Sequence, residues 1–467
     1  MSQESNRVSR LIKGTFIYAI GNIGSKLIMV LMLPLYTYFL SKEDFGYYDL
    51  SMTILFLSIS FVTLDLRDGV FRFLLHKQDE DHFKQVISSA FTVIWGNSFI
   101  VTLLTTLLNF FYPIQYFPYL LLTLLSYCVF DVQVQALRGI NKTLAFVQVN
   151  ILSAFLACGL CFILLKYGEL GIRSFYIANI VSRLVCIVYI EWRVGFFSLY
   201  YSWKSTFPEQ IQALLKYTLP LIPGVACWWL ISSSCRLFIT HFLGFEENGV
   251  FAIALRFSDM LFLISIIFYQ SWQEIAIREY RSKDKDVFFS KVFNQYFFIL
   301  VFLALAASFF IKVFFDLFIG AAYSESLLYI CLMLASVVFT GMSAFLDLGY
   351  QCSLQSSKSL PSIVSATLLN LILNFILIGY FHLYGAVFSS ILTYLYLFVY
   401  RIVDTRRYFK IRVSPLFFFA LFSLCCGIFI YYCVDNKIIL FLMGAICFVA
   451  ILLVTGRKTL MRLIQRN

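Results

Sequence analysis

Residues 21–34 read GNIGSKLIMVLMLP, and they lie within a mostly apolar run from Leu11 to Leu40. A helix of about 20 largely apolar residues is long enough to cross the hydrocarbon core of a bilayer. The run therefore predicts a membrane-spanning helix, and Lys26 lies near its middle. A charged group at that depth costs about 2.5 kcal/mol or more, so it normally faces protein or a water-filled cavity.

The composition of the whole chain extends this prediction. Of its 467 residues 61% are hydrophobic and only 13% are charged, whereas soluble proteins are about 45–50% apolar and about 25% charged. We predict an all-α polytopic membrane protein. The net charge of +11 comes from cations in short segments between apolar runs, so nucleic acid is not an expected partner.

Apolar windows bounded by turn and charge signals predict about fourteen transmembrane helices. The predicted helices cover residues 11–40, 46–64, 85–111, 114–138, 143–165, 171–193, 211–243, 246–268, 287–316, 325–350, 359–380, 383–403, 415–433 and 437–455.

Lysine and arginine residues predict the orientation of these helices. Most of the 36 fall in segments that are cytoplasmic if the N-terminus is inside, whereas Lys42, Lys166 and Lys437 are the few in outer loops. This asymmetry is what the positive-inside rule requires. We expect both termini to be cytoplasmic.

The loops between the predicted helices are short, and the sequence lacks a Walker-type loop, an HExxH motif and paired Cys/His metal spacing. We therefore expect no catalytic residues, no metal and no bound cofactor. Any coupling would come from an H⁺ or Na⁺ gradient or from the membrane potential.

An internal repeat is visible at low similarity. The stretch 39–54, FLSKEDFGYYDLSMTI, resembles 242–257, FLGFEENGVFAIALRF, and the alignment pairs Gly46 with Gly249. It predicts two pseudo-symmetric six-helix lobes with two appended helices, at residues 1–205, 206–408 and 409–467. Paired repeats around a site at mid-membrane are typical of transporters that alternate access.

Three predicted helices carry a cation on a polar face at membrane depth. Lys26 follows Tyr18 and Asn22 at intervals of four residues, and Arg183 has Asn179 one turn earlier. On the seventh helix, the segment SSSCR places Ser233 and Arg236 in an otherwise apolar run at 232–236.

These cations predict an anion site. We expect Lys26, Arg183, Arg236 and Arg256 to bind substrate in one aqueous cavity, or alternatively to form separate structural pairs with Asp131, Asp259 or backbone groups. Arg256 has Asp259 three residues later, so a local ion pair explains its place in a membrane span as well as a role in substrate binding does. Phosphate would suit the guanidinium and ammonium donors. The supporting polar residues are Tyr18, Asn22, Asn179, Ser233, Asn370 and Asn374.

Other residues are candidates for gating or ion coupling. The carboxylates are Asp131, Asp259 and Asp347, and prolines that can kink the first helix of each half are Pro34, Pro220 and Pro223.

The sequence also resembles a known family of bacterial polysaccharide transporters, the Wzx-type flippases. The resemblance is carried by KGTFIYAIGNIGSKLIMVLMLPLYTYFLSKEDFGYYDL (13–50), LPLIPGVACWWLISSSCRLFITHFLGFEENGVFAIALRF (219–257) and LLNLILNFILIGYFHLYGAVFSSILTYL (368–395). It extends over most of residues 10–405.

The resemblance implies the fold of the multidrug/oligosaccharidyl-lipid/polysaccharide (MOP) exporter superfamily, with two six-helix lobes in a V as in MATE transporters. It implies an undecaprenyl-diphosphate-linked glycan as substrate, moved from the cytoplasmic to the periplasmic leaflet for O-antigen lipopolysaccharide or other surface polysaccharide. Membrane lipids, a polysaccharide polymerase and a chain-length regulator are the implied partners. Many relatives carry Asp before the arginine of the seventh helix, whereas this chain has Cys235. The last two helices resemble the pair that forms a lipid-tail groove in the lipid II flippase subgroup.

Two alternatives remain open from the sequence. A drug/cation antiporter of the same fold would need carboxylates that face the cavity, for which Asp131 and Asp347 are candidates. A membrane polysaccharide polymerase or ligase would carry a sizeable periplasmic loop, and the predicted outer loops are far shorter.

Overall fold

The computed structural model describes residues 32–76, 79–353 and 355–464, and all secondary structure in these ranges is helical. Among the described residues, 32–40 and 48–226 form one compact unit, and 41–47 and 227–464 form a second.

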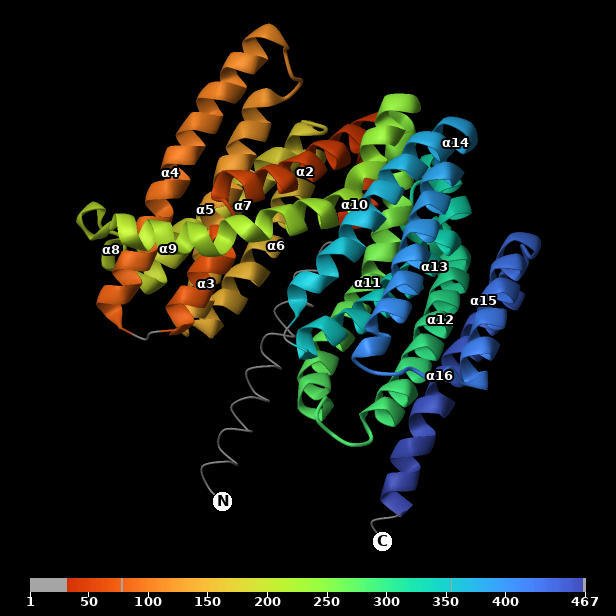
Figure 1. Cartoon of the computed structure of the whole chain (residues 1–467). Coiled ribbons are helices and arrows are strands. Elements are labelled where there is room, and N and C mark those ends of the chain that lie inside the picture. The colour runs from red at the N-terminus through yellow and green to blue at the C-terminus, as the bar shows by residue number, and fades with distance from the viewer. Residues whose placement is uncertain (1–31, 77–78, 354, 465–467) are drawn as a thin grey trace. The chain divides into compact units, whose positions relative to one another are not determined.

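The first unit contains most of α2 and all of α3 to α9 (Figure 1). The bounds are α2 (Lys42–Thr63), α3 (Leu66–His76), α4 (Glu80–Phe111), α5 (Phe117–Gly139), α6 (Thr143–Lys166), α7 (Arg173–Val194), α8 (Phe196–Tyr200) and α9 (Pro208–Thr218).

The second unit contains most of α10 and all of α11 to α16. The bounds are α10 (Ile222–Phe242), α11 (Phe245–Glu279), α12 (Lys285–Phe318), α13 (Leu327–Cys352), α14 (Leu360–Asp404), α15 (Pro415–Cys433) and α16 (Lys437–Ile464).

Within the described ranges, 12 helical segments are long and apolar enough to cross a membrane. One of them, Leu360–Arg407, covers two of the predicted spans, and most of the predicted span at 11–40 lies outside the described residues. The prediction of an all-helical protein with many membrane spans is confirmed.

The long helix α14 changes direction at His382, whose φ of 52° and ψ of −135° are not helical. Three residues later, a side chain on Gly385 would lie 2.1 Å from the carbonyl oxygen of Leu377, so only glycine allows the two parts to approach so closely. The sequence predicts a helix end near residue 380, and the structure places the break at His382.

Prolines interrupt the segment that was predicted as one helix over 211–243. Pro220 lies in a short 3₁₀ turn, Leu219–Leu221, which separates α9 from α10, and Pro223 is the second residue of α10. Proline lacks a backbone N–H and clashes with the preceding helical turn, so it is tolerated at a helix start but not in the interior. Pro34 lies within helical residues 32–39.

In the first unit, α5 packs against α3 and α7, and α6 packs against α7 (Figure 1). The short helix α9 packs against α3 and α4. Gly69 of α3 makes this possible, because a side chain there would lie 2.7 Å from Cγ2 of Thr218.

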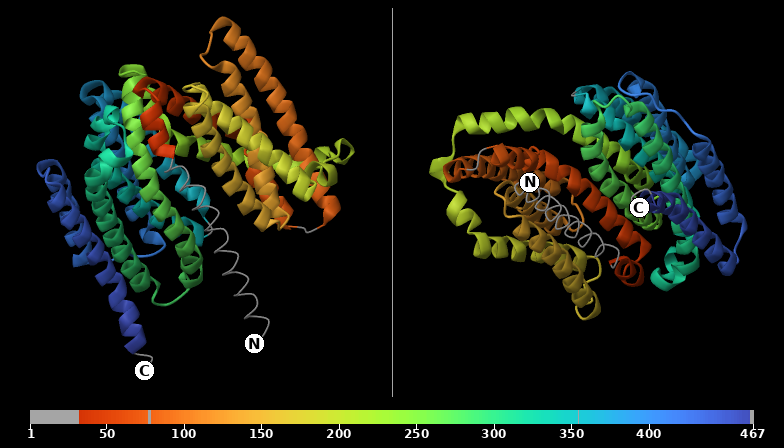
Figure 2. Two further views of the ribbon diagram at one scale, coloured as in Figure 1. Left: turned by 180° about the vertical axis from the view of Figure 1, so that it is seen from behind. Right: turned by 90° about the horizontal axis from the view of Figure 1, so that it is seen from below.

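In the second unit, α13 is covered by α11, α12 and α14, and the last two helices, α15 and α16, lie along α12 (Figure 2). Aromatic rings fill this contact: Phe417 of α15 stacks on Phe297 of α12 with ring centroids 4.0 Å apart. At the other end of α12, Lys312 donates to the carbonyl oxygens of Tyr431 and Val434, at 2.7 and 2.9 Å. Lys312 therefore caps the C-terminal end of α15.

Two glycines mark a close crossing between the starts of α2 and α11 within the second unit. A side chain on Gly46 would lie 1.8 Å from the carbonyl oxygen of Phe245, and one on Gly249 would lie 2.1 Å from that of Lys42. The buried Asn248 side chain donates to the carbonyl oxygen of Gly46 at 2.8 Å. The two glycines paired by the sequence repeat therefore belong to the same helix crossing.

Candidate functional site

Part of the predicted cationic site lies outside the described residues, namely Lys26 with Tyr18 and Asn22. Of the other cations, Arg183 belongs to the first unit, and Arg236 and Arg256 belong to the second. The convergence of all four on one cavity stays a prediction.

Among the predicted site residues that the structure describes in the first unit, Arg183 is the most completely enclosed. It lies on α7 and is only 7% exposed. Its guanidinium carbon lies 3.4 Å from the ring centroid of Tyr127 on the neighbouring helix α5. Nη1 donates to the backbone oxygen of Asn179 at 2.6 Å and to its Oδ1 at 2.9 Å.

The direct partners of Arg183 are polar or aromatic and carry no charge. Asn179 is itself oriented, because its Nδ2 donates to the Tyr48 hydroxyl at 3.1 Å and to the Phe175 carbonyl at 2.7 Å. Among the described residues no carboxylate lies within 4.0 Å of Arg183, and its buried Nε has no hydrogen-bond acceptor. A buried cation that is fixed in position and has no carboxylate within 4.0 Å among the described residues is suited to bind an anion.

The predicted coupling residue Asp131 has a partner that the sequence did not reveal. Its Oδ2 accepts a hydrogen bond from Nη1 of Arg67 on α3 at 3.3 Å. Arg67 also lies 3.7 Å from Asp65 and 3.7 Å from Asp68. One arginine is therefore shared by three carboxylates, and we name this set the Arg67 cluster.

Asp65 is the buried member of the Arg67 cluster. It is 2% exposed, and its Oδ2 has no hydrogen-bond donor. Burial, together with the negative charge of Asp68, raises the pKa of Asp65 to about 6. Asp65 and Leu64 both have positive φ, 54° and 49°, in the tight turn that joins α2 to α3. The sequence analysis did not single out Asp65, although its place between a predicted span and a basic segment was visible.

In the second unit, the SSSCR segment forms the middle of α10. Ser233, Ser234 and Cys235 are buried, and Arg236 is half-buried with its Nη1 3.5 Å from the carbonyl oxygen of Ser232.

A buried amide and hydroxyl cluster joins α10 to both parts of α14. Asn370 accepts from Ser234 at 2.9 Å and donates to Thr393 at 3.0 Å, and Asn374 donates to Asn370 at 2.9 Å. The structure brings the predicted Asn370 and Asn374 together in this cluster, where they hold helices in place. Ser234 and Thr393 were not predicted.

A small cavity of about 110 Å³ lies between α10, α11, α13 and α14 in the second unit. Its polar lining consists of the Asp259 carboxylate and several hydroxyl groups, with Trp228 and Tyr394 among its larger walls. The hydroxyl-bearing members are Ser232, Ser258, Ser336, Thr340, Ser390 and Tyr394. The predicted residue Asp259 therefore lines a small, partly open cavity, and Arg256 lies half-buried three residues earlier on the same helix.

The third predicted carboxylate, Asp347, pairs with an arginine of α14. Its Oδ1 lies 3.0 Å from Nη2 of Arg401, which also donates to the backbone oxygen of Ser343 at 3.0 Å. Arg401 is buried. Arg401 lies near the end of the span predicted at 383–403. Its burial inside the second unit was therefore not predicted from the sequence.

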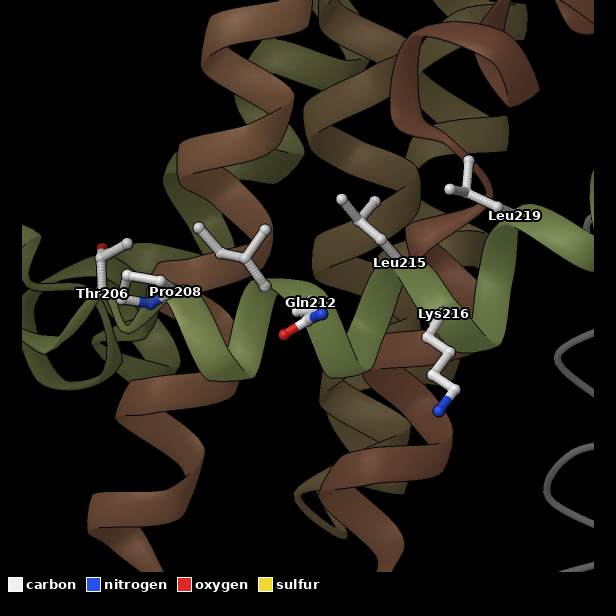
Figure 3. Close-up of a pocket in the computed structure, with 7 residues that line it drawn as sticks. Thr206, Pro208, Gln212, Leu215, Lys216 and Leu219 are labelled. Atoms are coloured by element: carbon white, nitrogen blue, oxygen red, sulfur yellow. The ribbon is translucent and has the colours of Figure 1, made fainter.

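A largely apolar groove of about 560 Å³ runs along one side of α9 in the first unit (Figure 3). Leu215 and Leu219 line it together with Gln212 and Lys216, so a single cation accompanies an apolar wall. Sequence reasoning treated this stretch as the start of a spanning helix and did not predict the groove.

Comparisons with known proteins agree with this architecture. The sequence model of a family described as polysaccharide biosynthesis protein matches residues 11–272. A comparison with curated protein sequences finds no match.

Several solved structures share the fold. The lipid II flippase MurJ in an inward closed conformation is 16% identical, with a TM-score of 0.69, over 95% of this chain and 100% of that one. An inward-facing multidrug resistance MATE transporter of the MOP superfamily is 14% identical, with a TM-score of 0.62, over 83% of this chain and 94% of that one. An outward-facing MATE transporter is 16% identical, with a TM-score of 0.58, over 85% of this chain and 95% of that one.

At these identities the structural likeness establishes the fold alone, which this chain shares with the MurJ and MATE structures. The family model covers more than half of the chain. The chain therefore belongs to the polysaccharide biosynthesis protein family and has the fold of the MOP transporter superfamily.

Proposed function

We propose that this protein is a flippase that moves an undecaprenyl-diphosphate-linked oligosaccharide from the cytoplasmic to the periplasmic leaflet of the bacterial inner membrane. The product would serve O-antigen or another surface polysaccharide, assembled by a polymerase with a chain-length regulator. Family membership and the transporter fold support the general class. The observation that carries the substrate assignment is Arg183, a buried cation with neutral hydrogen-bond partners.

Arg183 would hold one of the two phosphate groups. Its ring contact with Tyr127 and its bonds to Asn179 fix the guanidinium plane, so that the remaining N–H donors point in defined directions. Charge-assisted hydrogen bonds of this kind contribute about 1.5–3 kcal/mol each. Lys26, Arg236 and Arg256 remain proposed further contacts to the diphosphate, and Ser233 and Asn179 remain proposed contacts to polar groups.

A cation antiporter of the same fold is supported less well. Such a protein needs a carboxylate that can accept a cation in its transport site. In this chain Asp131 lies beside Arg67, and Asp347 lies beside Arg401. An adjacent guanidinium lowers the affinity of a carboxylate for a second cation.

The proposal is tested by replacing Arg183 and measuring glycan transport in cells that make equal amounts of each variant. We expect Arg183→Ala to lower surface polysaccharide about tenfold or more, with lipid-linked oligosaccharide accumulating on the cytoplasmic side, because one charge-assisted contact of about 1.5–3 kcal/mol is lost. Arg183→Lys keeps the charge without the planar fork and should be intermediate.

Arg173→Ala is the matched control. Arg173 lies on the same helix and is exposed, with its guanidinium 5.9 Å from the ring centroid of Tyr116. We expect normal transport in this variant. Unchanged transport by Arg183→Ala would remove the assignment of the phosphate contact.

A further inference from the structure

A second cationic pocket lies in the first unit, apart from Arg183. It has a volume of about 780 Å³ and is lined by residues of α3, α5 and α9. Two arginines contribute to it, Arg72 of α3 and Arg138 of α5, and the one carboxylate is that of Asp68. We name it the Arg72–Arg138 pocket.

Both guanidinium groups in the pocket are held against aromatic rings. The Cζ atom of Arg72 lies 4.5 Å from the ring centroid of Tyr217, and that of Arg138 lies 4.5 Å from the centroid of Phe71. Arg138 also donates through Nη1 to Gln135 Oε1 at 2.9 Å. A guanidinium held over the face of a ring still has N–H groups that can bind an anion.

The charge balance of the pocket is positive. Among the described residues no carboxylate lies within 4.0 Å of Arg72. Asp68 lies 3.7 Å from Arg67, so the positive charge of Arg67 partly compensates the negative charge of Asp68. An anion in the pocket would therefore meet two cations and one carboxylate that already has a partner.

Two glycines allow the three helices to meet around the pocket. Because Gly69 has no side chain, Thr218 of α9, the residue next to Tyr217, can pack against α3. Gly139 does the same for α5, since a side chain there would lie 2.6 Å from Cβ of Leu74 on α3. The positive-inside rule explains why cations lie in this part of the chain, but it requires neither ring stacking nor a cavity.

The pocket lies at the level expected for lipid headgroups. Helix α3 lies between two candidate membrane spans, and Arg138 is in the last turn of the span Phe117–Gly139. Phe73 and Leu75 add an apolar part to the lining. A ligand with a phosphate group next to a hydrocarbon part matches this combination of cations and apolar side chains.

We propose that the Arg72–Arg138 pocket binds the phosphate group of an anionic lipid at the membrane surface. Two lipids carry this chemistry, an anionic phospholipid of the bilayer and the polyprenyl-diphosphate carrier of a glycan. Only the second of these rests on the proposed function.

The experiment uses purified full-length protein in detergent and counts bound lipids by native mass spectrometry. The probes are phosphatidylglycerol and undecaprenyl diphosphate, with zwitterionic phosphatidylcholine as the reference lipid. The test variant is Arg72→Gln combined with Arg138→Gln, and each single variant is measured as well. The matched control is Arg193→Gln, an exposed arginine in the last turn of α7.

We expect the double variant to bind at least one phosphate probe about tenfold more weakly, while the control binds like the original protein. A loss confined to phosphatidylglycerol identifies the ligand as membrane phospholipid, and a loss confined to undecaprenyl diphosphate identifies it as the carrier. Unchanged binding of both probes by the double variant overturns the proposal.

Folding and function are kept separate in this experiment. Arg72 is exposed, so the single variant Arg72→Gln should melt at the original temperature and still bind more weakly. Equal binding by this well-folded variant would also count against the site. The export measurement on Arg183 tests the proposed function independently, so its failure would leave the binding result standing.

Discussion

Among the described residues, each unit of the protein contains an arginine–carboxylate pair that joins two helices. Arg67 and Asp131 come from α3 and α5, whereas Arg401 and Asp347 come from α14 and α13. The sequence predicted both carboxylates as candidates for gating or ion coupling, but it did not predict their arginine partners. The carboxylates were therefore visible in the sequence, and their partners, 64 and 54 residues away, required the folded structure.

Arg183 differs from these two arginines because its partners are an amide, a carbonyl and an aromatic ring. Its mid-span position and its relation to Asn179 were predicted from the helical period. The ring of Tyr127 was not, because it comes from another helix.

The Arg67 cluster makes stability depend on pH. The pKa of Asp65 is about 6 in the folded protein, above its ordinary value of 3.8. The folded state therefore holds a proton that the unfolded state releases between about pH 4 and pH 6, and stability falls as pH rises through this window. We expect Asp65→Asn to remove this slope and to raise stability at pH 7 by about 2–3 kcal/mol.

The measurement is the midpoint of thermal unfolding in detergent from pH 4.5 to pH 8. Asp81→Asn is the control, since Asp81 is an exposed carboxylate of the same unit. An original protein whose melting temperature did not decrease between pH 5 and pH 7 would contradict the raised pKa of Asp65.

At the scale of helices, glycine decides where elements can touch. The starts of α2 and α11 cross with backbone against backbone at Gly46 and Gly249. We expect Gly46→Ala or Gly249→Ala to destabilise the protein by about 3 kcal/mol or more, because the added carbon would overlap a carbonyl oxygen and force the helices apart.

Gly159→Ala is the matched control for these variants. Gly159 lies within α6, and nothing lies within 4 Å of a side chain placed there. Alanine has the higher helix propensity by about 1 kcal/mol, so this variant should be neutral or more stable. Equal melting temperatures for all three variants in detergent would show that the crossing is looser than described.

Helix positions were largely predictable from apolar runs, and breaks inside runs were less so. The span predicted at 415–433 coincides with α15. The division between α9 and α10 was not predicted, because Pro220 and Pro223 in an apolar run were interpreted as a kink. Whether proline bends a helix or ends it depends on packing, and here α9 packs against α3 and α4.

At the scale of the whole molecule, the cationic side chains predict orientation in the membrane. Arg406, Arg407, Lys410 and Arg412 lie between α14 and α15, whereas Lys437 follows the next turn. In a bacterial host we expect alkaline phosphatase, which folds only outside the cytoplasm, to be active when fused after Asn436 and inactive when fused after Lys410. The reverse pattern would contradict cytoplasmic termini.

The multi-span architecture could be predicted from composition and apolar periodicity because a bilayer limits the possible structures so strongly. The pockets could not. Neither Arg72 nor Arg138 was predicted as a site residue, because their contacts with Tyr217 and Phe71 depend on how three helices meet.

The crossing of α2 and α11 has a consequence for how such a chain can change over evolutionary time. If both halves descend from one duplicated segment, the ancestral glycine met its own copy, which makes the contact self-complementary. Even after the two halves diverge, neither glycine can be replaced easily, because a larger residue in one half would collide with the main chain of the other. Sequence drift is therefore expected to spare this pair of glycines longest, even where the two halves have lost almost all other likeness.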